Sequence, residues 1–451
     1  MKLKASIRRT GRTIEYPAFG ILVAMTLILL APFVTTYLCY AAFLICLYRI
    51  IRYDAKVFAT DYCILIPTTQ FFRTTGGMTF LIWLCLIAAV WFLFHGTIRA
   101  SASLVLLFTL LIYLITRMQM VIDGFVLCFG QMFTLYVLMP KQDAESAERT
   151  VKAFCWSVLG TSLYALVFRN APQILAIRGQ ESIAVLGTSI TRFSGLIKDP
   201  NYYMTMLVTG IGALCKLKET GRVQLFWFWG QVVAMTAFGI LTYSKTFFLM
   251  VFFLMGLYIK WQFWNKKYFK GVVFAILCVL AGIYFLMSKN SPFAVVLKRL
   301  AFGSSLSNIT TGRSDVYIRY WNAIVENVVT FLFGFGLKAP MLGKGTHMLY
   351  LELMYYVGVL GLIIVLGFFF SLIQDILIKN PQAKKQSLIA KYAVLAIVAI
   401  QYISLQGMFQ VLTYGVFFVA FLTIIITPKE VGSEERPQDD LPQPEATMKT
   451  E

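Results

Sequence analysis

The chain alternates between long apolar runs and short polar segments. About fourteen of the runs approach the length that crosses roughly 30 Å of hydrocarbon as a helix. They lie near residues 16–32, 34–50, 57–72, 78–95, 101–116, 120–139, 152–168, 201–217, 223–241, 246–260, 271–287, 347–370, 389–405 and 409–427. The third run contains Asp61 and Pro67, and the last two are closely paired, so the count is about 12–14. Because a helix satisfies its backbone within one segment, this pattern predicts an all-α, polytopic integral membrane protein.

Composition supports this class. Of the 451 residues, 59% are hydrophobic and 14% are charged, and the mean hydropathy is +0.74. Soluble domains contain about 25% charged residues, so an ordinary soluble domain is excluded. The basic cluster from Lys2 to Arg12 precedes an apolar run without a small-residue cleavage site. We therefore expect a retained first span rather than a cleaved signal peptide.

Basic residues gather in alternate connections, namely 141–152, 216–222, 260–270 and 379–391. By the positive-inside rule, these connections and both termini are predicted to be cytoplasmic. The predicted organisation is an N-terminal transmembrane bundle (1–168), a second membrane domain with long outward loops (169–427), and a Pro- and Glu-rich tail (428–451) that is predicted to be disordered. The net charge of +19 lies mostly in the cytoplasmic connections, where anionic lipid explains it, and we expect no nucleic-acid partner.

Three polar segments, 192–201, 304–319 and 343–352, fall on the opposite, extracytoplasmic face by this topology. They belong to extracytoplasmic loops 169–200 and 288–346, which carry more Lys and Arg than Asp and Glu. Long loops can cross a membrane whatever their charge, which is one explanation. The other is an anion site, because guanidinium groups bind phosphate oxygens in a planar fork.

Local sequence places these cations at helix starts. Asp199 is a good N-cap and Pro200 suits the first helical position, so the next helix directs its positive end outward. A turn over 311–315 precedes an amphipathic pattern, with Arg313 at its start. The apolar positions of that pattern are Tyr317, Trp321, Ile324, Val325 and Val328.

The sequence contains two histidines. His95 ends an apolar run on the cytoplasmic side, where an interfacial role is expected. His347 opens the long apolar run that starts near residue 347, beside several arginines. These surroundings favour the neutral imidazole that a general base requires, although a structural role at the interface is the alternative.

Four elements follow one another in order. They are Arg192-Phe193-Ser194-Gly195 with Asp199-Pro200-Asn201; Tyr243-Ser244-Lys245-Thr246; Gly312-Arg313 with Trp321 and Phe333-Gly334-Phe335-Gly336; and Thr346-His347-Met348-Leu349-Tyr350-Leu351-Glu352 with Gly358 and Gly361. Together they resemble the signature of the O-antigen ligase and Wzy-type O-antigen and capsular polysaccharide polymerase superfamily. The resemblance covers about 40% of the chain, from Arg192 to about Phe370. Lys245 stands where that family has Arg, and Met348 where it has Asn.

The resemblance implies a metal-independent glycosyltransferase without cofactors. Its donor would be an undecaprenyl-pyrophosphate-linked glycan, its acceptor a second glycan, and its location the outer face of a bacterial cytoplasmic membrane. Arg192 and Arg313 would hold the pyrophosphate, His347 would take the acceptor proton, and Lys245 would assist the leaving group. Asp199, Asn201, Arg319 and Trp321 would complete the substrate site.

A repeat-unit polymerase is the leading interpretation, with a flippase and a chain-length regulator as expected partners. An O-antigen ligase that uses a lipid A core acceptor shares the same motifs. A polysaccharide flippase or secondary transporter is the alternative from another class. The absence of an internal repeat and the few ionisable residues in the runs disfavour it.

Overall fold

The computed structural model describes residues 16–95, 101–117, 129–179, 182–185, 188–264, 272–273, 276, 313–337, 339–343, 345–405, 407 and 410–428. The predicted span 271–287, apart from three residues, lies outside these ranges. So do loop residues 288–312 and nearly all of the tail from residue 428 onward.

The described chain is all-α except for one short hairpin. Its first helices are α1 (Ala18–Leu30), α2 (Tyr37–Arg52), α3 (Ala55–Leu65), η1 (Ile66–Thr68), α4 (Phe80–Phe94), α5 (Ala102–Arg117), α7 (Gln131–Leu138), η3 (Met139–Lys141), α8 (Ala144–Val167) and α9 (Pro172–Arg178). Strands β1 (Ser182–Val185) and β2 (Thr188–Thr191) pair antiparallel, with Ser182 opposite Thr191. The later helices are α10 (Pro200–Glu219), α11 (Leu225–Ile240), α12 (Lys245–Trp264), α16 (Arg313–Val325), α17 (Val328–Phe333), α18 (Leu349–Lys379), α19 (Pro381–Lys384), α20 (Leu388–Gln401) and α21 (Val411–Ile425).

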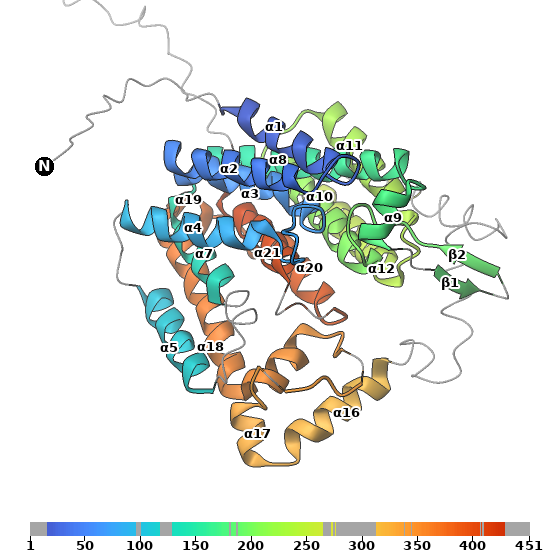
Figure 1. Ribbon diagram of the computed structural model, residues 1–451. Coiled ribbons are helices and arrows are strands. Elements are labelled where there is room, and N and C mark those ends of the chain that lie inside the picture. The colour runs from blue at the N-terminus through green and yellow to red at the C-terminus, as the bar shows by residue number, and fades with distance from the viewer. Residues whose placement is uncertain are drawn as a thin grey trace, which may run out of the picture.

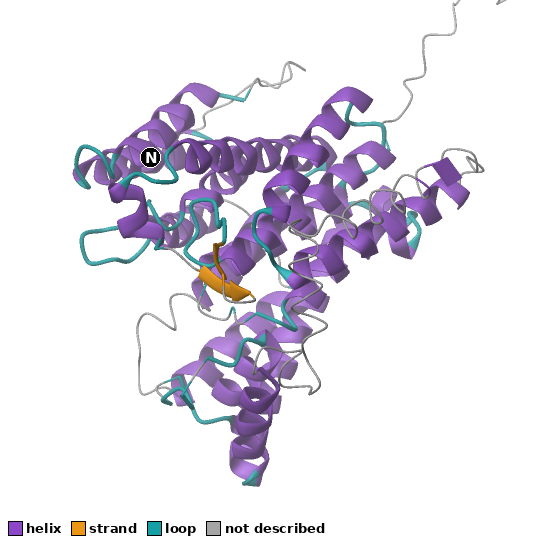
Figure 2. Ribbon diagram, turned by 90° about the vertical axis from the view of Figure 1, so that its right-hand side faces the viewer, coloured by secondary structure: helices purple, strands orange, loops and turns teal. Residues whose placement is uncertain are grey.

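The helices form an upper group and a lower group (Figure 1). In the upper group, α10 packs against α8, α11, α12, α20 and α21, so it lies at the centre of the fold. In the lower group, α18 packs along α5, and α16 and α17 pack against α18. Figure 2, turned by 90°, shows the same lower group projecting below the rest. The lower group therefore consists of α5, α16, α17 and α18, and α18 extends from it to the upper group.

Side-chain caps start several helices. Asp54 accepts from the backbone of Lys56 and Val57 at the start of α3, and Asp143 and Ser146 form a capping box at the start of α8. The predicted cap at Asp199 is confirmed, because its carboxylate accepts from Asn201 N at 2.7 Å and Pro200 is the first residue of α10. Each of these caps acts between residues two or three positions apart, so the start of the helix can be predicted from the sequence.

Among the described residues, two helices, α8 and α18, are long and apolar enough to cross a membrane by length and composition. Six shorter apolar helices of 10–17 residues accompany them: α1, α4, α5, α11, α20 and α21. The predicted third span is shorter than expected, since α3 ends at Leu65 and Pro67 lies in the single 3-10 turn η1. Pro67 lacks the backbone N–H that a continuing helix would use, which is the physical reason for this end.

A buried ion pair joins the first three helices. Arg49 of α2 donates from Nε and Nη2 to the two carboxylate oxygens of Asp61 in α3, at 2.7 and 2.8 Å. Its Nη1 donates to the carbonyl of Pro17 at 2.7 Å, and the hydroxyl of Tyr16 also donates to Asp61. In the sequence, Arg49 lies near the end of the apolar run 34–50 and Asp61 lies inside the next run, 57–72. The structure unites them in one fully hydrogen-bonded cluster.

The predicted extracytoplasmic loop 169–200 has structure of its own, with α9 and the β1–β2 hairpin inside it. The amphipathic helix predicted after residue 311 is present as α16, but its buried face differs. Val316, Tyr320 and Ile324 are buried, whereas Trp321 is 46% exposed and Val325 and Val328 are also exposed. The predicted stripe is therefore shifted by one position at two of its turns, because α18 and α17 cover the neighbouring face.

Candidate functional site

The first two sequence elements meet at the start of α10. Arg192 is 6% exposed; its Nε donates to the carbonyl of Thr242 at 2.8 Å and its Nη2 to Oδ1 of Asn201 at 3.0 Å. The same oxygen of Asn201 accepts from the hydroxyl of Ser244 at 3.2 Å. Phe193 N also donates to the carbonyl of Leu241 at 3.0 Å. Arg192 thus ties the Asp199-Pro200-Asn201 turn to the turn between α11 and α12.

That second turn holds its residues in an unusual backbone conformation. Tyr243 has φ of 51°, in the left-handed region that bulky residues rarely adopt. Thr242 and Ser244 on either side are buried. Lys245 is half-buried and is the first residue of α12, which begins directly after the turn that Arg192 contacts. Strain of this kind persists only where its surroundings hold it, and here the hydrogen bonds of Arg192 and Asn201 supply that support.

The third and fourth sequence elements, which contain Arg313 and His347, lie near the short segment that follows α20. Nη1 of Arg313 donates to the carbonyl of Ser404 at 2.9 Å. The hydroxyl of Tyr317, one turn later in α16, donates to the carbonyls of His347 at 3.2 Å and Ile403 at 3.4 Å. Arg313 therefore binds this segment directly, and Tyr317 links the segment to the backbone of His347, although neither sequence element contains the segment.

The start of α18 is fixed by the same segment. Leu349 N donates to the carbonyl of Tyr402 at 3.0 Å, and the buried carboxylate of Glu352 accepts from Gly407 N at 2.8 Å. His347 itself lies just before the helix, which begins at Leu349 with Met348 as its N-cap. Its φ is 50°, a region in which His is several-fold enriched over other non-glycine residues. We expected His347 to open the helix; it instead lies in the turn that precedes it.

Burial acts on the tyrosine that joins α16 to His347. It raises the pKa of the Tyr317 hydroxyl, and the charge of Arg313 acts in the opposite direction. The hydroxyl therefore stays protonated and remains a donor to the His347 carbonyl. This contact fixes the backbone of His347 and leaves the imidazole to other partners.

Each half of the site is held by its own contacts. The structure brings Arg192, Asp199 and Asn201 together directly, and brings Arg313 and His347 together through the segment after α20.

Two other predicted site residues, Arg319 and Trp321, lie toward the edge of this region, and His95 lies outside it. Arg319 donates from Nη1 to the carbonyl of Leu342 at 3.2 Å, which holds the loop before His347. Trp321 is half exposed on the outer side of α16. His95, expected to be interfacial, caps the end of α4, where its ring stacks on Trp91 with centroids 4.0 Å apart.

Sequence reasoning missed the segment Tyr402–Gly407. It had been assigned to the boundary between the last two apolar runs and given no role. A signal was present, since Ser404 and Gly407 interrupt two strongly apolar stretches. The segment supports the surroundings of Arg313, His347 and Glu352 through contacts between residues that are more than fifty positions apart in the sequence. Hydrophobic periodicity describes only neighbouring residues, so it does not predict these contacts. Within the described residues, no group of three or more His, Cys, Asp or Glu side chains could hold a metal ion.

Comparisons with protein-family models, with curated proteins and with solved structures find no match to this chain.

Proposed function

We propose that this chain is a polytopic membrane glycosyltransferase of the O-antigen ligase and polymerase superfamily. It polymerises undecaprenyl-pyrophosphate-linked oligosaccharide repeat units on the outer face of a bacterial cytoplasmic membrane. Both termini are cytoplasmic, and the site formed by Arg192, Arg313 and His347 faces outward. Transfer of the same donor to a lipid A core is the alternative acceptor chemistry.

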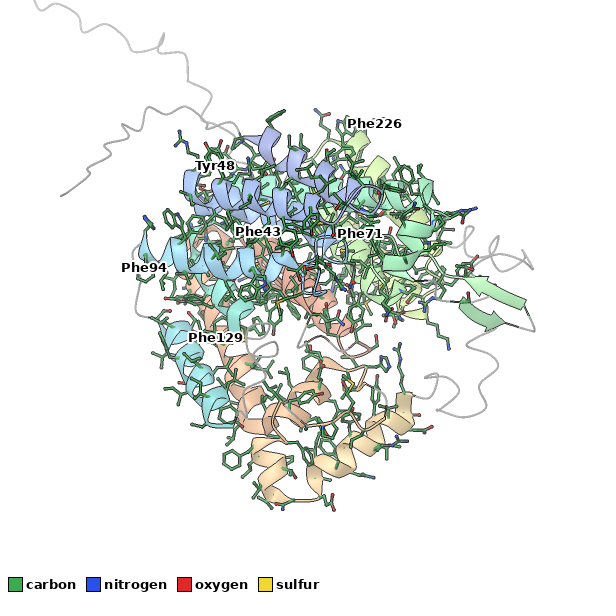
Figure 3. All side chains as sticks on the ribbon, in the orientation of Figure 1. Phe43, Tyr48, Phe71, Phe94, Phe129 and Phe226 are labelled. Carbon is green, nitrogen blue, oxygen red and sulfur yellow. The ribbon has the colours of Figure 1, made fainter. Side chains whose placement is uncertain are left out.

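The membrane assignment draws support from apolar side chains on the periphery. Phe19, Phe94 and Phe226 are 82%, 80% and 76% exposed, and many further large apolar side chains are at least half exposed. Figure 3 shows Phe94 and Phe226 at the outer edges of the upper group of helices. Extensive exposed apolar surface is costly in water and favourable against lipid tails. The two long apolar helices and the six shorter ones are consistent with the same surroundings.

One observation carries the functional proposal: two of the four sequence elements meet through α16. Arg313 donates to the carbonyl of Ser404, and Tyr317 donates to the carbonyls of Ile403 and His347. A phosphate-binding guanidinium and a proton acceptor are what glycan transfer from a lipid pyrophosphate needs. Arg192 and Asn201 lie at the start of α10, whose positive end adds to the favourable potential for an anion.

The reaction assigns one role to each group. The acceptor hydroxyl oxygen forms a bond to the anomeric carbon of the donor glycan, while the bond from that carbon to the phosphate oxygen breaks. His347 takes the hydroxyl proton, and undecaprenyl pyrophosphate departs with the bonding electron pair. Arg313 and Arg192 stabilise the charge that develops on the departing phosphate, with Lys245 assisting.

The test uses the purified full-length protein in detergent with a lipid-linked repeat unit as the only glycan. We expect a ladder of longer lipid-linked glycans and release of undecaprenyl pyrophosphate, and we expect both in the presence of EDTA. Transfer that occurs only when a lipid A core is added would replace polymerase with ligase. Activity that is lost on chelation and restored by magnesium would contradict the side-chain mechanism.

A further inference from the structure

Arg192 also lines a cavity of about 390 Å³. Its lining comes from the end of α8, the end of α9, the end of β2 and the turn between α11 and α12; α9 and β2 lie toward one side of the molecule in Figure 1. The described lining residues are Leu166, Arg169, Asn170, Arg178, Thr191, Arg192, Phe193, Leu241 and Tyr243. Three are arginines and none is acidic. The volume falls within the range of about 300–1,000 Å³ that small-ligand sites occupy.

Arg178 is the unusual member of this lining. It is 4% exposed, and its Nη1 and Nη2 donate to the carbonyls of Gly195 and Arg169, each at 3.3 Å. Its Nε is buried and has no hydrogen-bond partner in the described part of the chain. No carboxylate among the described residues forms an ion pair with Arg178, and burial lowers the pKa of its guanidinium. A buried charge without a counterion is costly unless a bound anion compensates it.

The other two arginines add positive charge around the same cavity. The Arg169 side chain is exposed and forms no hydrogen bond or ion pair with the described residues. Arg192 is buried and donates to neutral oxygen atoms of Thr242 and Asn201, and its guanidinium is the third in the lining of this cavity. Three guanidinium groups around one cavity repel each other when it is empty. An oxyanion that accepts from their N–H groups removes that repulsion.

The position of the cavity relative to the predicted membrane indicates which class of phosphate ligand it fits. Leu166 and Leu241 lie at the ends of the predicted spans 152–168 and 223–241, so the cavity lies where hydrocarbon gives way to water. Phe193 forms part of the wall, with the Arg178 guanidinium carbon 5.9 Å from its ring centroid. A wall that combines apolar side chains with guanidinium groups suits the phosphate of a lipid headgroup at the interface.

We propose that this cavity binds the phosphate-bearing headgroup of a lipid, with Arg178 and Arg169 as ligands in addition to Arg192. The lipid-linked pyrophosphate donor is one source of such a headgroup, and the inference rests on the proposed function for this donor and for the membrane boundary at the cavity. An ordinary anionic phospholipid is the other source. The shared chemistry is a phosphate group held by a fork of guanidinium donors.

The experiment measures binding to the purified full-length protein in detergent by native mass spectrometry. The probes are undecaprenyl pyrophosphate, phosphatidylglycerol and inorganic pyrophosphate. We expect Arg178→Gln and Arg169→Gln each to weaken binding of the preferred probe by at least about tenfold. Arg169→Gln changes an exposed side chain, so it tests the cavity even where the buried substitution reduces folding.

Arg73→Gln is the matched control. Arg73 is also partly buried, its Nε also lacks a partner in the described residues, and topology predicts it on the same face, yet it does not line this cavity. Its substitution should leave binding unchanged. Wild-type affinity in both Arg178→Gln and Arg169→Gln, an equal loss in Arg73→Gln, or no binding of any probe would overturn the proposal.

The three probes identify the source. Preference for undecaprenyl pyrophosphate assigns the cavity to the donor, and equal binding of phosphatidylglycerol assigns it to a membrane lipid. Competition by inorganic pyrophosphate shows that the phosphate group alone suffices. Binding does not require transfer, so a protein that binds through Arg178 but forms no polymer would refute the proposed function and retain this site.

Discussion

The backbone of Gly334 lies directly against the backbone of Gly358. A Cβ on Gly334 would lie 2.5 Å from Gly358 N, and one on Gly358 would lie 2.4 Å from the carbonyl oxygen of Leu332. Both glycines have positive φ, 72° and 69°, and Gly358 interrupts α18. Phe335 N and Gly336 N donate to the carbonyls of Tyr355 and Tyr356, which the interruption makes available. This contact attaches α17 and the loop after it to the helix that begins beside His347.

We predict that Gly358→Ala destabilises the protein strongly. Left-handed φ and a contact far below van der Waals distance each contribute roughly 1–3 kcal/mol. Gly367→Ala is the control in the same helix, because its Cβ would meet Leu106 at an ordinary 3.5 Å. A thiol-reactive dye that reports exposure of the buried cysteines on heating measures both. Equal melting temperatures for the two variants would contradict this account of the glycine pair.

His347→Ala is predicted to reduce glycan transfer by about 10²–10⁴ while donor binding stays near wild type, because a positioned base contributes that much to rate. His95→Ala is the control, since His95 stacks on Trp91 at the end of α4. His347→Gln separates the two interpretations of this residue. Glutamine retains size and hydrogen bonding, so near-normal polymer from His347→Gln in stable protein would mean that the histidine is structural.

Arg313→Lys is predicted to lower transfer substantially at normal protein abundance. An ammonium group cannot hold the Ser404 carbonyl and a phosphate in one planar arrangement as a guanidinium can. Arg73→Lys serves as the control, because Arg73 lies on the predicted outer face and its guanidinium donates to Gln70 rather than to either site cluster. Quantifying lipid-linked glycan length for both variants provides the measurement. Full activity in Arg313→Ala would remove this residue from the site.

Arg192 and Asn201 should be energetically coupled. Each single substitution, Arg192→Ala or Asn201→Ala, removes their 3.0 Å hydrogen bond, and the double variant cannot lose it twice. We expect the double variant to be less destabilised than the sum of the singles by about 0.5–3 kcal/mol. Thermal unfolding of the four proteins tests this. Simple additivity would show that the two elements are joined by backbone contacts alone.

For the buried Arg49–Asp61 ion pair, we expect a single substitution to destabilise the protein more than a double substitution does. Asp61→Ala leaves the buried guanidinium without its carboxylate and is expected to cost about 3–5 kcal/mol. Replacing both residues with apolar ones, Arg49→Met with Asp61→Leu, should recover much of that loss because no unpaired charge stays buried. A double variant that is less stable than Asp61→Ala would show that the hydrogen bonds of Arg49 to Pro17 dominate.

Local chemistry determined much of this protein by sequence alone. Apolar runs located most helices, and the Asp199-Pro200 pair located the start of α10, since a cap and a fixed φ act within a few residues. The amphipathic pattern located α16, but its buried face could not be read from it, because the packing of α17 and α18 decides that face.

Tertiary structure alone decided which oxygen atoms accept hydrogen bonds from the site arginines. Thr242 and Ser404 accept through backbone carbonyls, and every residue has a carbonyl, so no sequence pattern marks these two. The same holds for Arg178: its side chain resembles any other loop arginine in sequence, and burial against Gly195 and Arg169 makes its charge consequential. Contacts between distant segments are set by how the helices pack, and that packing is a property of the whole chain.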